Sequence, residues 1–265
     1  MTKLDDLIDW FADKKKVIVA LSGGVDSALV AYAAYQKLGN SAIAVTADYK
    51  TLSQEELQTA KKVCLEIGIP QLFLEYDELE NMQFVENDQN RCFHCRMELG
   101  THLIKLSEDL DVRFIVDGTH VDDLGEFRPG IEALKKNGIR SPLMETQFSK
   151  SQIRYFAKLV GLSVYDKPSN SCLASRIPWG QKITSEKLTR IELSETIVKQ
   201  LTKIKQVRVR DLNGSAKIEV DKESIYLFDD RILNQITEKF SMIGFTSVEV
   251  DQEGYKPGKI NVISD

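Results

Sequence analysis

The stretch that most constrains the fold is SGGVDS, residues 22–27, which stands between an apolar run and a helical pattern. The run VIVAL, residues 17–21, is continuously apolar, as expected of a strand buried on both faces. Residues 28–39 have a helical composition and end at a glycine. A glycine-rich loop between a buried strand and a helix is where parallel sheets bind phosphate. The stretch therefore predicts an α/β fold with an anion site at this loop.

The residue types in the loop suit a nucleotide. Two glycines allow backbone N–H groups to close around an anion, two serines add hydroxyl donors, and Asp26 can hold Mg²⁺. The motif G-K-[ST] is absent, so no lysine is aimed at a phosphate as in a P-loop NTPase. The alternative is a simple tight turn between strand and helix. The candidate nucleotide-binding residues are Ser22, Gly23, Gly24, Val25, Asp26 and Ser27.

The rest of the chain separates into two patterns. The first part alternates strands and helices, which predicts a parallel, doubly wound sheet. Its further strands are expected at 41–47, 71–76 and 113–119, and its further helices at 53–68 and 97–110. The second part has a helix from Thr184, alternating strands at 207–211 and 216–220 around Asn213-Gly214, a helix near 232–243 and a strand at 247–251. We expect a nucleotide domain over 1–178 and a small α+β domain over 179–265.

Composition and charge weigh against several classes of protein. The chain is 42% hydrophobic and 28% charged with a net charge of −5, so no basic stripe for nucleic acid is evident. No segment approaches the roughly 20 apolar residues of a membrane-spanning helix. The first residues lack the apolar core of a secretion signal. We expect a cytoplasmic protein with neither a nucleic-acid nor a membrane partner.

Two motifs together resemble the PP-loop ATP pyrophosphatases. SGGVDS is one, and DGTHVDD at residues 117–123 is the other. Members of that superfamily cleave ATP between the α- and β-phosphates and adenylate a substrate. The resemblance implies ATP and Mg²⁺ as cofactors and places further residues at the nucleotide and metal site: Asp117, Gly118, Asp122 and Asp123. Taken alone, Asp-Gly-Thr is equally typical of a turn.

Four further stretches resemble the LarE family, and the similarity covers essentially the whole chain. They are EFRPGIEA (126–133), SCLASRIPWG (171–180), VRVRD (207–211) and GYKPGKIN (254–261). LarE proteins are sulfur transferases that mature the nickel-pincer cofactor of lactate racemase. The resemblance implies that a pyridinium biscarboxylate mononucleotide is adenylated with release of pyrophosphate, after which sulfur displaces AMP and leaves a thiocarboxylate. We also expect a homo-oligomer.

The anionic acceptor needs cations. Arg208 and Arg210 stand two residues apart on a predicted strand, so their side chains leave the same face and can fork onto one phosphate or carboxylate. The resemblance assigns them to the phosphate of the acceptor, and the alternative is a solvated strand face. Weaker candidates for acceptor binding are Arg128, Lys256 and Lys259, with Arg176 as a catalytic candidate. The resemblance also suggests Glu195 and Glu219 as ligands of a divalent metal.

The cysteines bear on the source of sulfur. Cys172 stands at the position of the sulfur donor in LarE, where the cysteine of the best-known version gives up its own sulfur. That version lacks the C-x-x-C pair formed here by Cys92 and Cys95. We expect Cys92, Cys95 and Cys172 to hold a 4Fe–4S cluster whose open iron carries an exchangeable sulfide. Cys64, in an apolar helix, is expected in the core.

Several alternatives stay open at this point. The C-x-x-C pair also suits structural zinc or two unrelated thiols. The sulfur of Cys172 can be sacrificed, as in the best-known version. Different enzyme classes with the same nucleotide loop are a cluster-dependent tRNA thiolase and an ammonia-using synthetase. A nucleotide sensor would bind ATP without releasing pyrophosphate.

Overall fold

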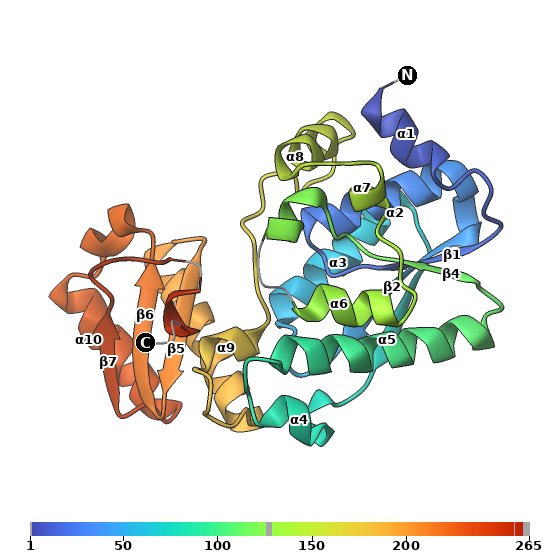
Figure 1. The fold of residues 1–265 in the computed structure, drawn as a ribbon. Helices are drawn as coiled ribbons and strands as arrows, with labels where there is room; N and C mark the ends of the chain where they lie inside the picture. The colour runs from blue at the N-terminus through green and yellow to red at the C-terminus, as the bar shows by residue number, and fades with distance from the viewer. Residues whose placement is uncertain (1, 126–128, 257, 262–265) are drawn as a thin grey trace. The chain divides into compact units, whose positions relative to one another are not determined.

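The computed structural model describes residues 2–125, 129–256 and 258–261. The chain forms two compact units. The first unit comprises Met1–Glu78 and Asn90–Asn170, and the second comprises Leu79–Gln89 and Ser171–Asp265. Figure 1 labels most of their helices and strands. The predicted domain boundary at residue 178 thus lies within the segment that begins the main part of the second unit.

A parallel sheet of four strands forms the centre of the first unit. Its strands are β1 (Val17–Ala20), β2 (Ala42–Asp48), β3 (Gln71–Glu75) and β4 (Phe114–Val116), in the order β3-β2-β1-β4. All three pairings are parallel, and Val17 of β1 lies opposite Ala42 on one side and Phe114 on the other. The predicted α/β fold with a parallel sheet is therefore confirmed.

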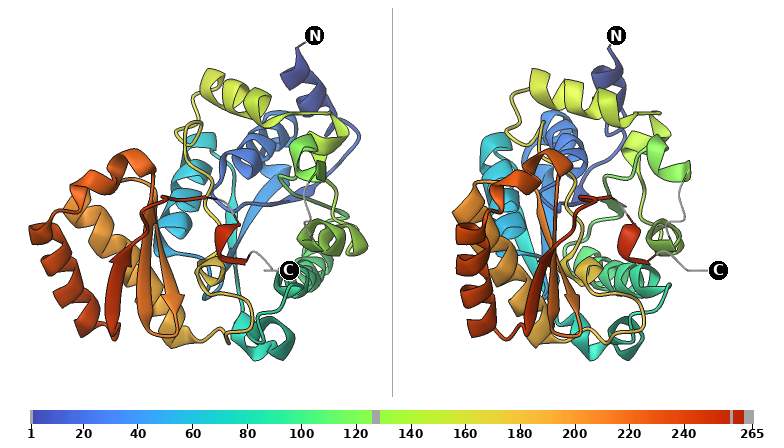
Figure 2. Two further views of the ribbon diagram at one scale, coloured as in Figure 1. Left: turned by 60° about the vertical axis from the view of Figure 1, so that its left-hand side comes forward. Right: turned by 90° about the vertical axis from the view of Figure 1, so that its left-hand side faces the viewer.

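Helices cover both faces of this sheet (Figure 2). Val17 and Val19 pack into one core and Ile18 into another. The first core contains α1 (Lys3–Asp9), α2 (Val25–Leu38), α3 (Gln54–Ile67), α7 (Pro142–Glu145) and α8 (Lys150–Leu159). The second contains α5 (Arg91–Asp109) and α6 (Pro129–Lys136). The continuous apolar run of β1 is explained by this burial from both sides.

The second unit is built on a sheet of three strands in the order β5-β6-β7. β5 (Val207–Leu212) and β6 (Ser215–Val220) are antiparallel, and β7 (Ser247–Val250) runs parallel to β6. Asn213 and Gly214 join β5 to β6 with φ of 53° and 92°, as the predicted hairpin turn requires. The helices α9 (Ser185–Thr202) and α10 (Asp230–Met242) pack on the sheet through Val198 and Phe240.

A short segment from the first half of the sequence also belongs to the second unit. It contains α4 (Met82–Val85). The side-chain amide of Asn87 donates hydrogen bonds of 2.8 Å to the carbonyl oxygens of Pro178 and Gln181. The backbone N–H of Ile183 donates to the carbonyl of Val85 at 3.0 Å. These contacts tie residues 79–89 to the segment 177–183. Within the part of the chain that the structure describes, no helix is long and apolar enough to cross a membrane.

Candidate functional site

The SGGVDS loop closes on itself between β1 and the N-terminus of α2. The Ser27 hydroxyl donates to the carbonyl oxygen of Gly24 at 3.1 Å and accepts from the backbone N–H of Ser22 at 3.2 Å. Gly24 is the N-cap of α2 and offers no capping side chain, so the first N–H groups of the helix are available to an anion. Gly23 has a φ of +78°, and a Cβ there would lie 2.9 Å from the carbonyl oxygen of Glu56. Both backbone conformation and space therefore require glycine at position 23.

The second predicted motif lies directly against this loop. A Cβ on Gly118 would lie 2.6 Å from the backbone nitrogen of Ser27, so the two backbones touch. Asp117 is buried, and its carboxylate accepts hydrogen bonds of 2.7 Å from the hydroxyls of Thr119 and Ser141. The structure thus brings together SGGVDS and DGTHVDD, which are about 90 residues apart in sequence, at the carboxyl ends of β1 and β4.

Three carboxylates of these motifs converge on a lysine and a histidine. The Nζ of Lys150 lies 2.6 Å from both carboxylate oxygens of Asp26, and its backbone N–H donates to Asp122 at 2.7 Å. The Nε2 of the buried His120 lies 3.6 Å from the Oδ2 of Asp123 and 3.9 Å from the Oδ1 of Asp26. Carboxylate oxygens are the ligands that Mg²⁺ prefers, although among the described residues these side chains do not gather closely enough to form a metal site by themselves.

Sequence reasoning missed the cations of this site. Besides Lys150, Lys167 reaches the loop, with its Nζ 2.8 Å from the Oε2 of Glu56 and 3.4 Å from the carbonyl oxygen of Gly23. The capping box of Ser149 marks the start of α8 and could have drawn attention to Lys150 beside it. Neither lysine belongs to the SGGVDS loop, and both reach it from other segments. Together with the helix N-terminus they can neutralise a polyphosphate.

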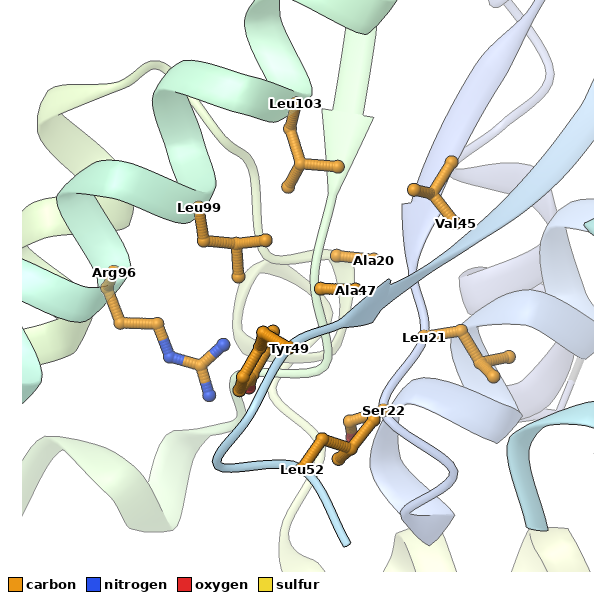
Figure 3. Close-up of a pocket in the computed structure, with 10 residues that line it drawn as sticks. All are labelled: Ala20, Leu21, Ser22, Val45, Ala47, Tyr49, Leu52, Arg96, Leu99 and Leu103. Carbon is orange, nitrogen blue, oxygen red and sulfur yellow. The ribbon is translucent and has the colours of Figure 1, made fainter. Parts of the chain in front are cut away.

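A cavity adjoins the loop on the α5 face of the sheet (Figure 3). Its walls come from the carboxyl-terminal parts of β1 and β2, the residues after them, and α5. Most of its lining is apolar, with polar groups from one serine, one tyrosine and one arginine. The lining residues are Ala20, Leu21, Ser22, Val45, Ala47, Tyr49, Leu52, Arg96, Leu99 and Leu103.

Arg176 organises the Cys172 segment of the second unit from a fully buried position. Its Nε and Nη2 donate to the two carboxylate oxygens of Glu195 at 2.8 and 3.1 Å. Its Nη1 donates to the backbone carbonyls of Ser171 and Cys172 at 2.6 and 3.0 Å. Burial acts against the charged guanidinium, but the carboxylate of Glu195 outweighs it and holds the pKa of Arg176 above its ordinary value. The side chain fixes the backbone on which Cys172 stands.

Arg208 and Arg210 leave the same face of β5, and both are 4% exposed. The alternative of a solvated strand face therefore does not describe them. Arg210 donates to Glu219 at 2.6 Å and to the carbonyl of Ser175 at 2.9 Å. The ring of Tyr255 lies 5.5 Å from the guanidinium of Arg208 and 6.0 Å from that of Arg210. Burial, and then the positive charge of Arg176, lower the pKa of Arg208.

The other predicted ligands and cations are placed as follows. Glu195 and Glu219 each pair with an arginine, as described above. Lys259 lies with its Nζ 2.8 Å from the Oδ2 of Asp251 and 2.9 Å from the Oε2 of Glu253, and Lys256 lies 3.5 Å from the same oxygen of Glu253. Arg128 falls outside the described residues.

The cysteines lie in different settings. Cys92, which is exposed, and Cys95, which is half-buried, stand in the first turns of α5 in the first unit. Cys172 is half-buried and precedes a 3₁₀ turn, Leu173–Arg176, of the second unit. Cys64 is buried in α3, and burial raises its pKa to about 12, as expected of a core thiol. Among the described residues, no three His, Cys, Asp or Glu side chains gather as a metal site. The cluster and the divalent-metal site therefore stay predictions.

Comparison with known proteins agrees with the two motifs. Residues 16–91 match the family described as queuosine biosynthesis protein QueC. An uncharacterized protein, slr1717, of Synechocystis is 41% identical over 98% of this chain and 97% of its own length. The pyridinium-3,5-bisthiocarboxylic acid mononucleotide synthase of Lactiplantibacillus plantarum is 28% identical over 98% of this chain and 94% of its own length. The uncharacterized protein MJ0830 of Methanocaldococcus jannaschii is 29% identical over 91% of both chains.

Proposed function

The chain belongs to the LarE family of PP-loop proteins, and from this we propose that it is an ATP-dependent sulfur transferase acting on a carboxylate. The name of the Lactiplantibacillus relative specifies a product with two thiocarboxylates on a pyridinium mononucleotide. We propose the corresponding biscarboxylate as the acceptor. The observation that carries the proposal is the contact between SGGVDS and DGTHVDD, joined by the pairing of Lys150 with Asp26.

The first step is adenylation. A carboxylate oxygen of the acceptor attacks the α-phosphorus of ATP, the bond from that phosphorus to the bridging oxygen breaks, and pyrophosphate leaves. The N–H groups at the start of α2 hold phosphate oxygens, and Asp26 with Asp122 and Asp123 offers oxygen ligands to the accompanying Mg²⁺. Lys150 and Lys167 supply positive charge for the departing pyrophosphate.

The second step replaces oxygen by sulfur. A sulfur nucleophile attacks the carbonyl carbon of the acyl-adenylate, the bond from that carbon to the AMP oxygen breaks, and a thiocarboxylate remains. We assign the phosphate of the acceptor to Arg208 and Arg210, whose shared face and burial support a desolvated, bidentate contact. Arg176 keeps Cys172 in a fixed backbone position through its bonds to the carbonyls of Ser171 and Cys172.

For the source of sulfur we propose a 4Fe–4S cluster held by Cys92, Cys95 and Cys172. Three thiolates are a suitable donor set for such a cluster with one iron left to an outside ligand, and the cluster would supply a bound sulfide. Placement of Cys92 and Cys95 three residues apart on α5 puts both thiols on one side of that helix. Burial of Cys64 within α3 leaves three thiols for this role.

The cysteine assignment predicts a shared fate for three variants. We expect Cys92→Ala, Cys95→Ala and Cys172→Ala each to lose iron and sulfur transfer together after anaerobic purification, because two protein ligands rarely hold four irons. Cys64→Ala is the matched control and should keep both. If Cys172→Ala alone were inactive, and the Cys172 peptide lost its sulfur during one turnover by mass spectrometry, the sacrificial mechanism would replace the cluster.

The nucleotide site predicts that Asp26→Ala abolishes formation of AMP and pyrophosphate while the fold survives. The carboxylate is the partner of Lys150 and a proposed ligand of Mg²⁺, whereas the loop backbone is held by Ser22 and Ser27. Asp9→Ala, which removes the partner of Lys37 on the surface, serves as the control. Chromatography of the nucleotides and a thermal melt of each variant make the comparison. Wild-type rates of pyrophosphate release from Asp26→Ala would contradict the assignment.

A further inference from the structure

The cavity beside the nucleotide loop contains a cation that the proposed mechanism does not use. Arg96 enters it from α5, and its guanidinium lies beside Tyr49 (Figure 3). The side chain is half-buried. Across residues 2–125, 129–256 and 258–261 it forms neither a hydrogen bond nor an ion pair. An arginine partly removed from water usually has an anionic partner, and none of the described residues provides one through a hydrogen bond or an ion pair.

Among the described residues, no carboxylate forms an ion pair with Arg96. Burial acts against the charged form, but Tyr49, Cys95, Tyr76 and Asp117 together hold the pKa of Arg96 above its ordinary value. Asp117 is the carboxylate among these four groups. The carboxylate of Asp117 already accepts hydrogen bonds from Thr119 and from the Ser141 hydroxyl. The hydrogen bonds to Asp117 therefore come from the DGTHVDD loop and from the N-cap of α7.

Neighbouring groups hold the side chain in place. A Cβ on Gly130 of α6 would lie 3.0 Å from the Cγ of Arg96, so the backbone of α6 packs on the aliphatic part of the arginine. The ring of Tyr49 lies 5.5 Å from that of Tyr76, which stacks on His102 at 4.5 Å. The packing of α6 on its aliphatic part restricts the side chain of Arg96. A cation ordered before its ligand arrives binds at a lower entropic cost.

The cavity defines the kind of ligand. A planar guanidinium binds carboxylate or phosphate oxygens as a fork. The apolar walls, which include Val45, Leu99 and Leu103, suit a flat ring or hydrocarbon surface. Ser22 of the nucleotide loop lines the same cavity, so a ligand held by Arg96 also reaches the site of adenylation.

We propose that Arg96 binds an anionic group, carboxylate or phosphate, of a substrate that enters this cavity. The inference rests on the proposed function, since that function supplies two sources of the anion: the α-phosphate of the nucleotide and a carboxylate of the acceptor. Arg96 is then a binding residue of the first unit, in addition to Arg208 and Arg210 of the second.

The test is calorimetric titration of the full chain with two probes, AMP and pyridinium-3,5-biscarboxylic acid mononucleotide, each alone. We expect Arg96→Gln to weaken one of them about 10- to 100-fold, because a charge-assisted bidentate contact is lost. Loss of AMP affinity identifies the phosphate, and loss of acceptor affinity identifies the carboxylate. Arg96→Lys, which keeps the charge and the aliphatic part but lacks the fork, should fall between wild type and Arg96→Gln. Arg113→Gln, which changes an exposed arginine of the same unit, is the control.

The outcomes separate this inference from the proposed function. If Arg96→Gln and Arg96→Lys both bound the two probes as tightly as wild type, Arg96 would not be a ligand-binding residue. The proposed function would still stand in that case, provided that the wild type releases AMP and pyrophosphate. If Arg96→Gln failed to fold, wild-type affinities in the folded Arg96→Lys variant would by themselves overturn the inference. A wild-type protein that bound neither probe would contradict the proposed function.

Discussion

The charged residues of the candidate site differ in how well their positions and partners could be predicted from the sequence. Arg208 and Arg210 could be placed on one face of a strand because side chains alternate along β-structure, and the structure has them so. The pairing of Arg176 with Glu195 could not be foreseen, because it joins a 3₁₀ turn to a helix through tertiary packing. The same holds for Lys150 and Asp26, which are 124 residues apart.

The Arg176–Glu195 pair yields a prediction that separates two roles of Arg176: pairing with the buried carboxylate of Glu195, and holding the backbone of Ser171 and Cys172 in position. Arg176→Ala leaves the carboxylate of Glu195 buried without its guanidinium, which should cost about 3–5 kcal/mol of unfolding free energy. The double variant Arg176→Met/Glu195→Leu should recover part of this loss, because it removes both charges. Sulfur transfer should stay low in both variants, since neither donates to the carbonyls of Ser171 and Cys172.

Urea unfolding and a product assay on the same preparations make that comparison. Arg113→Ala, at an exposed arginine, is the control and should stay within a few tenths of a kcal/mol of wild type. Wild-type sulfur transfer by the double variant would show that Arg176 does not position the Cys172 segment.

Helices and strands could be predicted from the sequence where a run of buried apolar residues or a capping or turn residue marks them. The four parallel strands lie within two residues of the predicted stretches at each end, apart from the shorter β4, because buried strands read as apolar runs. The helix predicted at 97–110 begins earlier, at Arg91. Its true start could not be predicted, because its first turns are polar and its N-cap, Asn90, forms no side-chain cap. The parallel pairing of β7 with β6 leaves no mark in the sequence, since strand composition does not specify a neighbour.

The contact between the two loops gives a prediction at this scale. Gly118→Ala would place a Cβ 2.6 Å from the nitrogen of Ser27 and 3.0 Å from the carbonyl carbon of Asp26, so one backbone has to move. We expect a loss of about 1–3 kcal/mol in stability from overpacking. We expect a larger loss of activity, about 100-fold in pyrophosphate release, because the phosphate site shifts.

The control for this variant is Gly39→Ala. Gly39 has a φ of +53° and a ψ of −134°, a sparsely populated conformation, but open space around its Cβ position, so alanine adds backbone strain of about 1–3 kcal/mol without displacing a loop. Thermal melts and pyrophosphate release should therefore diverge for Gly118→Ala and not for Gly39→Ala. Equal activity of the two variants would show that the loop contact does not set the phosphate site.

At the scale of the whole molecule, the family and the α/β fold could be predicted from the sequence. Which segments of the chain make up each unit could not. Motifs spread over the chain resembled the LarE family, and full-length similarity to relatives confirms this. Residues 79–89 belong to the second unit through hydrogen bonds of Asn87 to Pro178 and Gln181, which are about 90 residues away. No local sequence pattern indicates such a contact, because only the folded chain brings the two segments together.

The central claim is that one chain couples adenylation to sulfur transfer on a carboxylate. The most direct measurement is an anaerobic reaction of the wild-type protein with MgATP, pyridinium-3,5-biscarboxylic acid mononucleotide and sulfide, with all products quantified by liquid chromatography and mass spectrometry. We predict AMP, pyrophosphate and thiocarboxylate in equal amounts. Formation of ADP and phosphate, or of AMP with no sulfur in the acceptor, would contradict the claim.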